Sequence, residues 1–307
     1  MVRHALVTGG AGFIGSNLVE LLVEDGDWKI TVVDDLSTGS LGNLEKVLDN
    51  SLLDFKPISI FDLITVKPFD VIFHLAALPR IQPSFESPIE HLTSNVATGL
   101  HILELMRKEQ HFPRIVYSSS SAVYGNPNEI PTSENALINP LNPYAFQKYE
   151  FEKYLEIMST RYPINYCSLR YFNPYGPRSF NRENPLNAYS SVVGIFLNQH
   201  AEGRPLTITG DGSQRRDFIH VSDVAKANLL CANHIGELPK AMNIGSGVTF
   251  SVVEVATLIG GKFEYIPARG SEAQITFADI SKVSKTLKWE PEKSLEIYVK
   301  EQLKMGQ

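Results

Sequence analysis

Short apolar runs alternate with helical patterns over residues 1–120. Strands are predicted at His4–Thr8, Lys29–Val33, Asp70–Leu75 and Arg114–Ser118. Apolar residues at Ile14, Leu18, Leu21 and Leu22 follow one face of a helix over Ile14–Glu24, and a second helix is predicted over residues 94–108. Strands that alternate with helices form parallel β-α-β units with right-handed crossovers, and nearly continuous apolar strands indicate a sheet covered on both faces. The pattern therefore predicts an α/β fold with a doubly wound parallel sheet.

The pattern changes in the second half of the chain. A helix is predicted from near Tyr144 to about Arg161, followed by a strand at Asn165–Tyr171. Residues 174–187 then lack periodicity and indicate a long loop, and beyond them short elements are broken by glycine pairs. We expect residues 1–172 to form the larger lobe, with segments around 213–246 returning to it. Residues 173–307 should mostly build a smaller mixed α/β lobe.

Composition excludes several classes of protein. The 307 residues are 43% hydrophobic, which argues against disorder, and Cys167 and Cys231 are the only cysteines, so a disulfide scaffold is excluded. No run approaches the ~20 apolar residues of a membrane span, and Met1–Val7 resembles a first strand more than a signal peptide. The net charge of −6, without a basic run, makes nucleic acid an unlikely partner. We expect a soluble, cytoplasmic protein that binds no metal.

A glycine-rich turn follows the first strand and opens the first helix. Its residues are Gly9, Gly10, Ala11, Gly12, Phe13, Ile14 and Gly15. Backbone without Cβ atoms approaches a pyrophosphate closely, and the helix N-terminus attracts its negative charge. Asp34 ends the second strand, where a carboxylate accepts hydrogen bonds from the hydroxyls of an adenosine ribose. A turn needed only for tight packing is the alternative, which this register of strand, helix and acidic residue disfavours.

The residues after Asp34 select between the two nicotinamide cofactors. The segment Asp35, Leu36, Ser37, Thr38 and Gly39 adds a second negative charge and no basic residue to meet a 2′-phosphate, so NAD is preferred to NADP. Asp62, with Leu63 after it, follows a third apolar segment and is a candidate for an adenine contact, although a turn carboxylate is nearly as plausible. Leu75, Ala76 and Ala77 form a small apolar strand end over which a dinucleotide could pass.

A serine run and a Tyr-x-x-x-Lys pair form the candidate catalytic group. Ser118, Ser119, Ser120 and Ser121 stand at the end of a predicted strand, at the sheet edge where open α/β sheets bind ligands. Tyr144 and Lys148 share one helix face. A nearby ammonium favours the phenolate, which then accepts a proton from a sugar or alcohol hydroxyl. An exposed Tyr–Lys pair on an ordinary helix is the alternative.

The motifs GGAGFIG, DDLSTG, HLAA, SSSSAVYG, YAFQK, RYFNPYG and RRDFIHVSDV resemble the extended short-chain dehydrogenases/reductases over nearly the whole chain. Within them the chain is most similar to the nucleotide-sugar epimerases, UDP-galactose 4-epimerases in particular. The resemblance implies a Rossmann-type fold and assigns Ser120, Tyr144 and Lys148 as catalytic residues, with Lys148 also holding the nicotinamide ribose. It places Asn95 in support of the lysine and adds Ser118, Ser119 and Tyr171 to the cofactor site.

The same resemblance assigns a nucleotide-sugar pocket. Asn173 matches a position that contacts the phosphates or the sugar, Arg216 and Arg269 match diphosphate-binding arginines, and Glu272 matches the carboxylate that meets the uridine ribose. The strand Leu206–Thr209, with Thr207 and Thr209, resembles the one that frames uracil. Arg178 could touch cofactor or substrate, and for Arg178 and Arg215 a surface ion pair is equally plausible.

Departures from relatives narrow the activity that the resemblance implies. Ser121 and Ala122 stand where 4,6-dehydratases carry Asp-Glu, which argues against that elimination. Asn173 replaces a threonine common in glucuronate 4-epimerases, which weakens the case for a uronate as the substrate without excluding it. Thr276 stands where a bulkier residue restricts relatives to unsubstituted hexoses, so an N-acetyl group at C2 is expected to be tolerated. Pro79 replaces a lysine of one group of galactose enzymes, whose contact must be lost or replaced.

The implied reaction is reversible C4 epimerisation of a UDP-hexose through a transient 4-keto sugar and tightly bound NAD. The substrate would be UDP-glucose or UDP-galactose, with the N-acetylated pair also considered. The alternatives are another nucleotide-sugar enzyme, such as a uronate 4-epimerase, a dehydratase or a reductase, and a non-catalytic NAD- or nucleotide-sugar-binding regulator. Relatives commonly form homodimers through two helices per subunit, which here would be the helix at 94–108 and the one that holds Tyr144.

Overall fold

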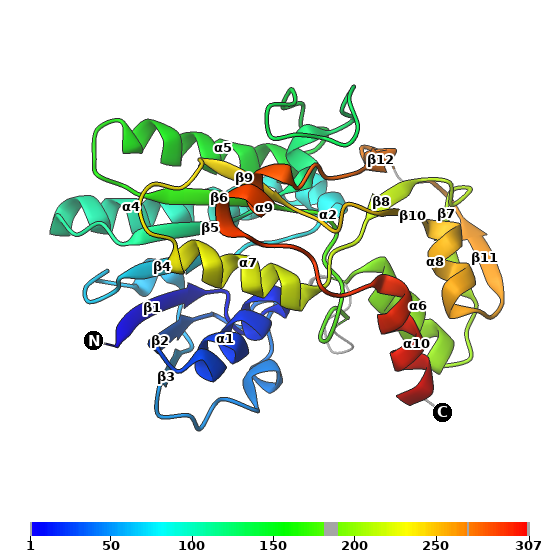
Figure 1. Ribbon diagram of the computed structural model, residues 1–307, viewed down its shortest axis with the longest axis horizontal. Coiled ribbons are helices and arrows are strands. Elements are labelled where there is room, and N and C mark those ends of the chain that lie inside the picture. The colour runs from blue at the N-terminus through cyan, green and yellow to red at the C-terminus, as the bar shows by residue number, and fades with distance from the viewer. Residues whose placement is uncertain (1, 181–189, 269, 306–307) are drawn as a thin grey trace.

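A seven-stranded parallel sheet forms the centre of the protein. The computed structural model describes residues 2–180, 190–268 and 270–305. The strand order is β3-β2-β1-β4-β5-β6-β9, which is the doubly wound order of dinucleotide-binding folds extended by one strand (Figure 1). The strands are β1 (Arg3–Thr8), β2 (Trp28–Val33), β3 (Leu53–Lys56), β4 (Val71–His74), β5 (Arg114–Ser120), β6 (Tyr166–Tyr171) and β9 (Ala241–Ile244). The predicted fold class is confirmed.

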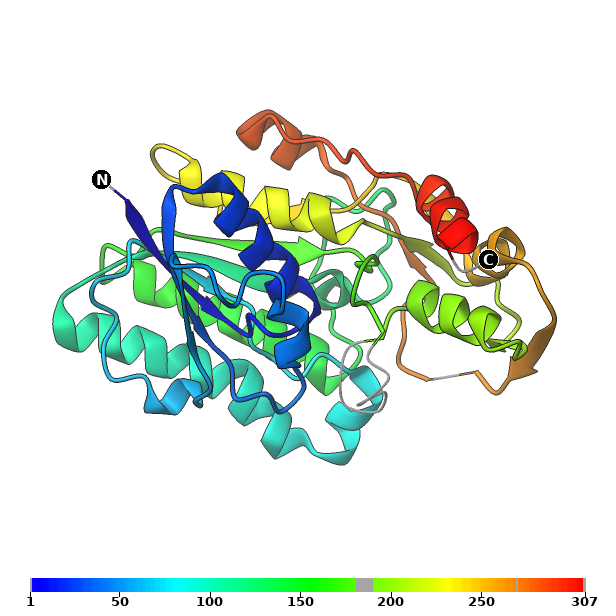
Figure 2. The ribbon, with the colours of Figure 1, turned by 90° about the horizontal axis from the view of Figure 1, so that it is seen from below.

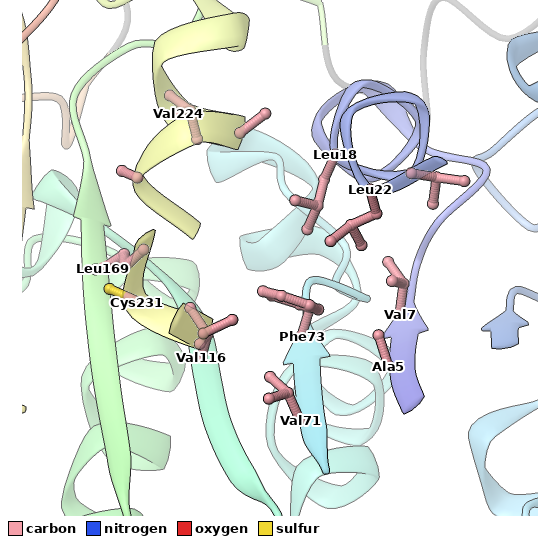
Figure 3. Close-up of a cluster of buried hydrophobic side chains, with 14 of the residues drawn as sticks. Ala5, Val7, Leu18, Leu22, Val71, Phe73, Val116, Leu169, Val224 and Cys231 are labelled. Atoms are coloured by element: carbon pink, nitrogen blue, oxygen red, sulfur yellow. The ribbon is translucent and has the colours of Figure 1, made fainter. Parts of the chain in front are cut away.

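Helices cover both faces of this sheet. On one face lie α1 (Phe13–Asp25), α7 (Val221–Asn233) and α9 (Ser281–Leu287), and on the other lie α4 (Thr98–Glu109) and α5 (Pro143–Ser159). Because side chains alternate along a strand, Ala5 and Val7 of β1 pack toward α1 while Leu6 packs toward α4. Figure 3 shows the first of these cores, where Leu18 and Leu22 of α1 meet Phe73 of β4.

The remaining elements gather at the carboxyl ends of β5 and β6 (Figure 2). They are α6 (Val192–Ala201), β7 (Leu206–Thr209), β8 (Arg215–Asp217), β10 (Thr249–Ser251), α8 (Val252–Ile259), β11 (Phe263–Ile266), β12 (Ile275–Thr276) and α10 (Leu295–Met305). The strands form two small sheets, β10-β8-β12 and β11-β7. Leu206 and Ile208 of β7 share a separate apolar core with α6, α8 and α10. The chain returns to the main sheet in between, through α7 and β9. The division into lobes at residue 172 stays a prediction.

Several predicted elements differ at their boundaries. The strand expected at Arg114–Ser118 continues to Ser120, because its ladder with β6 extends to Tyr171. The helix expected over residues 94–108 begins with a π-helical turn, η3 (Thr93–Ala97), before α4. Two short helices that the apolar pattern did not predict, α2 (Ile81–Glu86) and α3 (Pro88–Leu92), precede it. Within the described ranges, no helix is long and apolar enough to cross a membrane.

Candidate active site

A cleft with a volume of about 350 Å³ lies at the carboxyl edge of the main sheet. Its walls bring together most of the residues that the sequence singled out: Gly9, Gly12, Phe13, Ile14, Gly15, Asp34, Asp35, Ser37, Thr38, Leu75, Ala76, Ala77, Ser118, Ser119, Ser120, Tyr144, Lys148, Tyr171, Asn173, Arg178, Arg216, Glu272 and Thr276. They come from strand ends, helix starts and the smaller sheets. One continuous cavity therefore joins the glycine turn, the Ser-Tyr-Lys group and the candidate substrate residues.

The glycine turn is packed so closely that side chains have no room. A Cβ on Gly15 would lie 2.1 Å from the carbonyl oxygen of Gly9, and one on Gly9 would lie 2.7 Å from the backbone of Ala76. Gly9 also has a φ of 70°, which favours glycine. Gly12 is the N-cap of α1 and supplies no side-chain cap. The backbone of this turn thus faces the cleft at a helix N-terminus, which suits a pyrophosphate.

Asp34 is fixed at the end of β2 by backbone donors. Its carboxylate accepts hydrogen bonds of 2.9 Å from the N–H groups of Ala11 and Leu36. Burial raises the pKa of Asp34, and these two bonds oppose the rise. Leu36 has a φ of 59°, so the chain turns sharply after the carboxylate. Asp34 faces the cleft, whereas Leu36 and Gly39 support the turn behind it.

The predicted adenine contacts lie beside the cleft, outside its wall. Asp62 is exposed at the end of a short 3-10 turn, η2 (Ile60–Asp62), and Leu63 is buried behind it. The wall at this end is formed instead by Ile58, Ser59 and Ile60, which the sequence analysis did not identify. The contacts of Asp62 and Leu63 with the cofactor stay predictions.

Ser120, Tyr144 and Lys148 converge on the middle of the cleft. The Lys148 Nζ lies 6.0 Å from the centroid of the Tyr144 ring and donates a 2.8 Å hydrogen bond to the carbonyl of Ser118. Burial raises the pKa of Tyr144 to about 12, against a hydrogen bond with Ser120 that lowers it. Burial lowers the pKa of Lys148 to about 7, against the charge of Glu152 that raises it. The arrangement holds a hydroxyl, a phenol and an amine together for proton transfer.

Neighbouring polar side chains position the start of α5. Asn142 caps the helix by accepting a 2.9 Å hydrogen bond from the N–H of Ala145. The N–H of Tyr144 donates to the hydroxyl of Ser84 on α2. Asn95, in the π-helical turn, donates to Gln147 at 2.9 Å and accepts from the N–H of Leu78 at 2.7 Å. Asn95 therefore ties α5 to the segment after β4, since its side chain hydrogen-bonds Leu78 and Gln147.

At the far end of the cleft, Asn173 and Thr276 are joined. The Asn173 amide donates to the Thr276 hydroxyl at 2.9 Å and to the carbonyl of Asp217 at 2.8 Å. Both amide hydrogens are thereby engaged, and the carbonyl oxygen is the part of the side chain left to accept a bond from a ligand. Arg216 lies 3.7 Å from Glu272 across the same end of the cleft, and burial lowers its pKa.

The structure treats the remaining arginines and threonines predicted for the substrate pocket in different ways. Arg178 makes a two-pronged ion pair with Glu20 of α1 at 3.0 and 2.5 Å, although its side chain also lines the cleft. Thr207 and Thr209 lie in the separate β7-β11 sheet, outside the cleft wall, and their contact with uracil stays a prediction. Arg269 lies outside the described residues. Arg215 points to Thr249 and Glu254, as a surface ion pair would.

Comparison with known proteins identifies the family. The model of the NAD dependent epimerase/dehydratase family matches residues 5–245. This chain belongs to that family. A putative UDP-glucose 4-epimerase of Methanocaldococcus jannaschii is 37% identical over 96% of this chain and 95% of its own length.

Solved structures of the epimerase family share the fold along the whole chain. The UDP-glucose 4-epimerase of Thermotoga maritima, crystallised with UDP-glucose, superposes with a TM-score of 0.88 at 33% identity, covering 98% of both chains. The UDP-glucuronic acid 4-epimerase of Bacillus cereus, in complex with UDP-glucuronic acid and NAD, gives a TM-score of 0.89 at 27% identity over 99% of both chains.

The cofactor of this epimerase family fits the residues described above. The turn at Gly9 and Gly15 is bare backbone that admits no Cβ, it lines the cleft at the N-terminus of α1, and Asp34 presents a carboxylate at the same wall. NAD is the cofactor, as the sequence predicted. When NAD is bound, Gly12 and Gly15 would hold its pyrophosphate and Asp34 its adenosine ribose, and the contact of Lys148 with the nicotinamide ribose stays a prediction.

Proposed function

We propose that the protein is a UDP-hexose 4-epimerase. The observation that carries this proposal is the joining of Ser120, Tyr144 and Lys148 to the Arg216–Glu272 end by one cavity. A sugar whose 4-hydroxyl lies at Tyr144 would thus have its nucleotide held at the Arg216–Glu272 end of the same cavity. Ser121 and Ala122 offer no carboxyl group for dehydration. The names of the relatives support the same activity.

NAD supplies a reversible hydride acceptor when it is bound at the cleft. Tyr144, as the phenolate, takes the proton of the sugar 4-hydroxyl and later returns it. Ser120 holds the same oxygen by hydrogen bonding, because its hydroxyl already bonds the phenol. Lys148 supplies the positive charge that favours the phenolate. Since the hydride that leaves C4 with the proton of the hydroxyl would also be returned to C4, inversion requires that the 4-keto sugar present its other face between the two transfers.

The nucleotide provides the anchor for this turning. Arg216 would pair with the diphosphate, and Glu272, which it contacts in the structure, would then accept hydrogen bonds from the uridine ribose. Asn173 would offer its carbonyl oxygen to a sugar hydroxyl, since its amide hydrogens are engaged. Binding energy gained far from C4 is thereby used to position the reacting carbon.

A panel of UDP-sugars tests the proposal. Purified protein is incubated with UDP-glucose, UDP-galactose and UDP-glucuronate, and the configuration at C4 is followed by NMR. We expect UDP-glucose and UDP-galactose to interconvert without net consumption of NAD, and UDP-glucuronate to react at least tenfold more slowly. Net oxidation of added NADH would indicate a reductase. Absence of turnover with every sugar would favour a binding regulator instead.

Tolerance of an N-acetyl group at C2 of the sugar is a separate prediction. Thr276 is short and its hydroxyl is held by Asn173, so the pocket wall there is set by one methyl group. We expect UDP-N-acetylglucosamine to be epimerised at a rate within about tenfold of UDP-glucose, a difference of about 1.4 kcal/mol in the barrier. Thr276→Tyr should remove the acetylated activity selectively. Complete inactivity of the native protein on the acetylated sugar would contradict the prediction.

A further inference from the structure

A buried ion pair that the proposed mechanism does not use lies behind the serine strand. Glu152 of α5 and Arg170 of β6 have side chains only 7% and 6% exposed. Arg170 donates from Nε at 3.0 Å and from Nη2 at 2.6 Å to the two carboxylate oxygens. This two-pronged geometry holds both charged groups in one orientation. Burying such a pair costs desolvation energy, which suggests a role other than stability.

Glu152 contacts the catalytic edge from behind. The Ser119 hydroxyl donates to Glu152 Oε1, and Ser119 stands between Ser118, whose carbonyl accepts from Lys148, and Ser120. Glu152 also follows Lys148 by one helical turn, so both side chains lie on one face of α5. Lys148 is 2% exposed, and Glu152 is the group whose charge opposes the effect of that burial.

Arg170 is anchored on its other side. Its Nη1 donates to the Tyr124 hydroxyl at 2.9 Å, which in turn donates to Asn243 of β9 at 2.6 Å. The guanidinium therefore cannot follow Glu152 if that carboxylate shifts toward Lys148. The negative charge of Glu152 is shared between a fixed cation on β6 and the amine at the active site.

We propose that the Glu152–Arg170 pair is a positioning device that sets the charge on Lys148. Glu152 stabilises the ammonium, and Arg170 limits that stabilisation by holding the carboxylate toward β6. The role of this balance in catalysis rests on the proposed function, whereas the effect on Lys148 does not. Both are positioning residues, because neither lines the cleft.

Other groups facing Lys148 from the packed elements are neutral. His74 of β4 has its pKa lowered to about 3 by burial and by the Lys148 charge, so the imidazole carries no charge near pH 7. Tyr117 of β5, whose ring centroid lies 5.1 Å from Nζ, has its pKa raised by burial. Tyr144 has a pKa of about 12. Among the described groups, Glu152 is thus the charge that acts on the Lys148 amine against the effect of burial, and Arg170 is the group that holds that carboxylate.

Direct titration of Lys148 tests the proposal. Lysines labelled with ¹³C at the ε-carbon are followed by NMR across pH in the purified protein, and the Lys148 signal is identified by its loss in Lys148→Met. We expect Glu152→Gln to lower the titration midpoint by about 1 pH unit, the scale of a nearby opposite charge. Arg170→Gln should raise it, because Glu152 then faces Lys148 alone. Arg170→Lys should restore most of the native midpoint.

The opposite directions of the two expected midpoint shifts distinguish this role from a purely structural one. Both single variants lose a buried partner and should be less stable, yet only a charge effect moves the midpoint in opposite directions. Asp223→Asn is the matched control, since it removes a carboxylate that is 2% exposed on α7 and bonded to the N–H of Lys293. We expect no shift there. Equal shifts in both single variants, or none, would overturn the proposal.

If Glu152→Gln and Arg170→Gln do not fold, variants that keep the charge can replace them. Glu152→Asp keeps the charge but withdraws it from Ser119, and a smaller downward shift is expected. An unchanged midpoint in folded Glu152→Asp, or a midpoint in Arg170→Lys that rises as far as in Arg170→Gln, would overturn the proposal as well. If native protein turns over UDP-sugars, the alkaline limb of its rate profile should move with the midpoint. If it turns over none, the proposed function fails and the titration result stands on its own.

Discussion

At the scale of the residue, the chemistry of the cleft is incomplete without its ligands. Tyr144 has a pKa of about 12 and Lys148 one of about 7, so at neutral pH the phenol keeps its proton and the amine is partly uncharged. Both values result from burial. A bound nicotinamide cofactor would bring positive charge to this cleft, and ligand hydroxyls that accept from the amine would favour the ammonium, so both would shift these groups toward their charged forms. Under the proposed function, the base would therefore form when the cofactor and the sugar are both in place.

Tyr144→Phe isolates the proton transfer. The variant keeps the ring and loses only the hydroxyl, so we expect it to bind NAD and UDP-sugar with affinities near those of the native protein. Its kcat should fall by about 10²–10⁴-fold, the usual contribution of a positioned acid or base. Turnover by NMR and UDP-sugar binding by calorimetry provide the two measurements.

Tyr154→Phe is the control, because it removes a phenolic hydroxyl from an exposed position of the same helix. It should leave kcat unchanged. A near-native rate in Tyr144→Phe would show that another group transfers the proton.

At the scale of the element, one buried carboxylate joins the parts of the substrate end. Asp217 of β8 is 0% exposed and accepts from Ser246 at 2.6 and 2.8 Å and from the N–H groups of Gly247 and Ala278 at 3.1 Å. Its own carbonyl accepts from Asn173. β8, the turn after β9 and the segment after β12 thus meet at one side chain that follows Arg216 directly.

Asp217→Asn should disrupt this junction. The amide brings two donors to a site that offers only donors, so about 3 kcal/mol of unfolding free energy should be lost, the scale of a broken buried charged contact. KM for the UDP-sugar should rise more than kcat falls, because the junction supports Asn173 and Arg216. Urea unfolding and steady-state kinetics measure the two effects.

Asp211→Asn provides the comparison, since that carboxylate also accepts from Ser213 but is exposed. Its loss should change the free energy of unfolding by less than about 0.5 kcal/mol. Equal destabilisation by both substitutions would argue against a special role for Asp217.

The sequence predicts most of the main sheet because its strands are buried on both faces and are therefore continuously apolar. It does not reveal α2, α3 or the π-helical turn, whose conformation depends on contacts such as that of Asn95 with Leu78.

In the site, strand ends and the glycine turn are predictable from local pattern. The Glu152–Arg170 pair is not, although the spacing of Lys148 and Glu152 by one turn was a signal for it. The partner of Arg178 is Glu20, far away along the chain, and only the folded structure brings them together.

At the scale of the whole molecule, one outer face carries several exposed apolar side chains. α3 and α5 pack together on the side of the sheet that α4 also covers (Figure 2). Phe146 and Ile157 of α5 are 55% and 61% exposed, and Ile89 of α3 is 79% exposed. Large exposed apolar side chains on neighbouring helices are typical of an interface. We therefore propose that a homodimer forms through this face, with α5 at its centre.

Ile157→Glu tests this arrangement. A carboxylate in place of a side chain that packs between subunits should weaken the dimer at least tenfold in Kd, since burying an isoleucine contributes about 1.5–3 kcal/mol. Sedimentation velocity over a range of concentrations measures the change. Ile235→Glu is the matched control, because Ile235 is 94% exposed in the turn after α7, away from this face. A native protein that sediments as a monomer, or a dimer that both substitutions weaken equally, would place the interface elsewhere or exclude it.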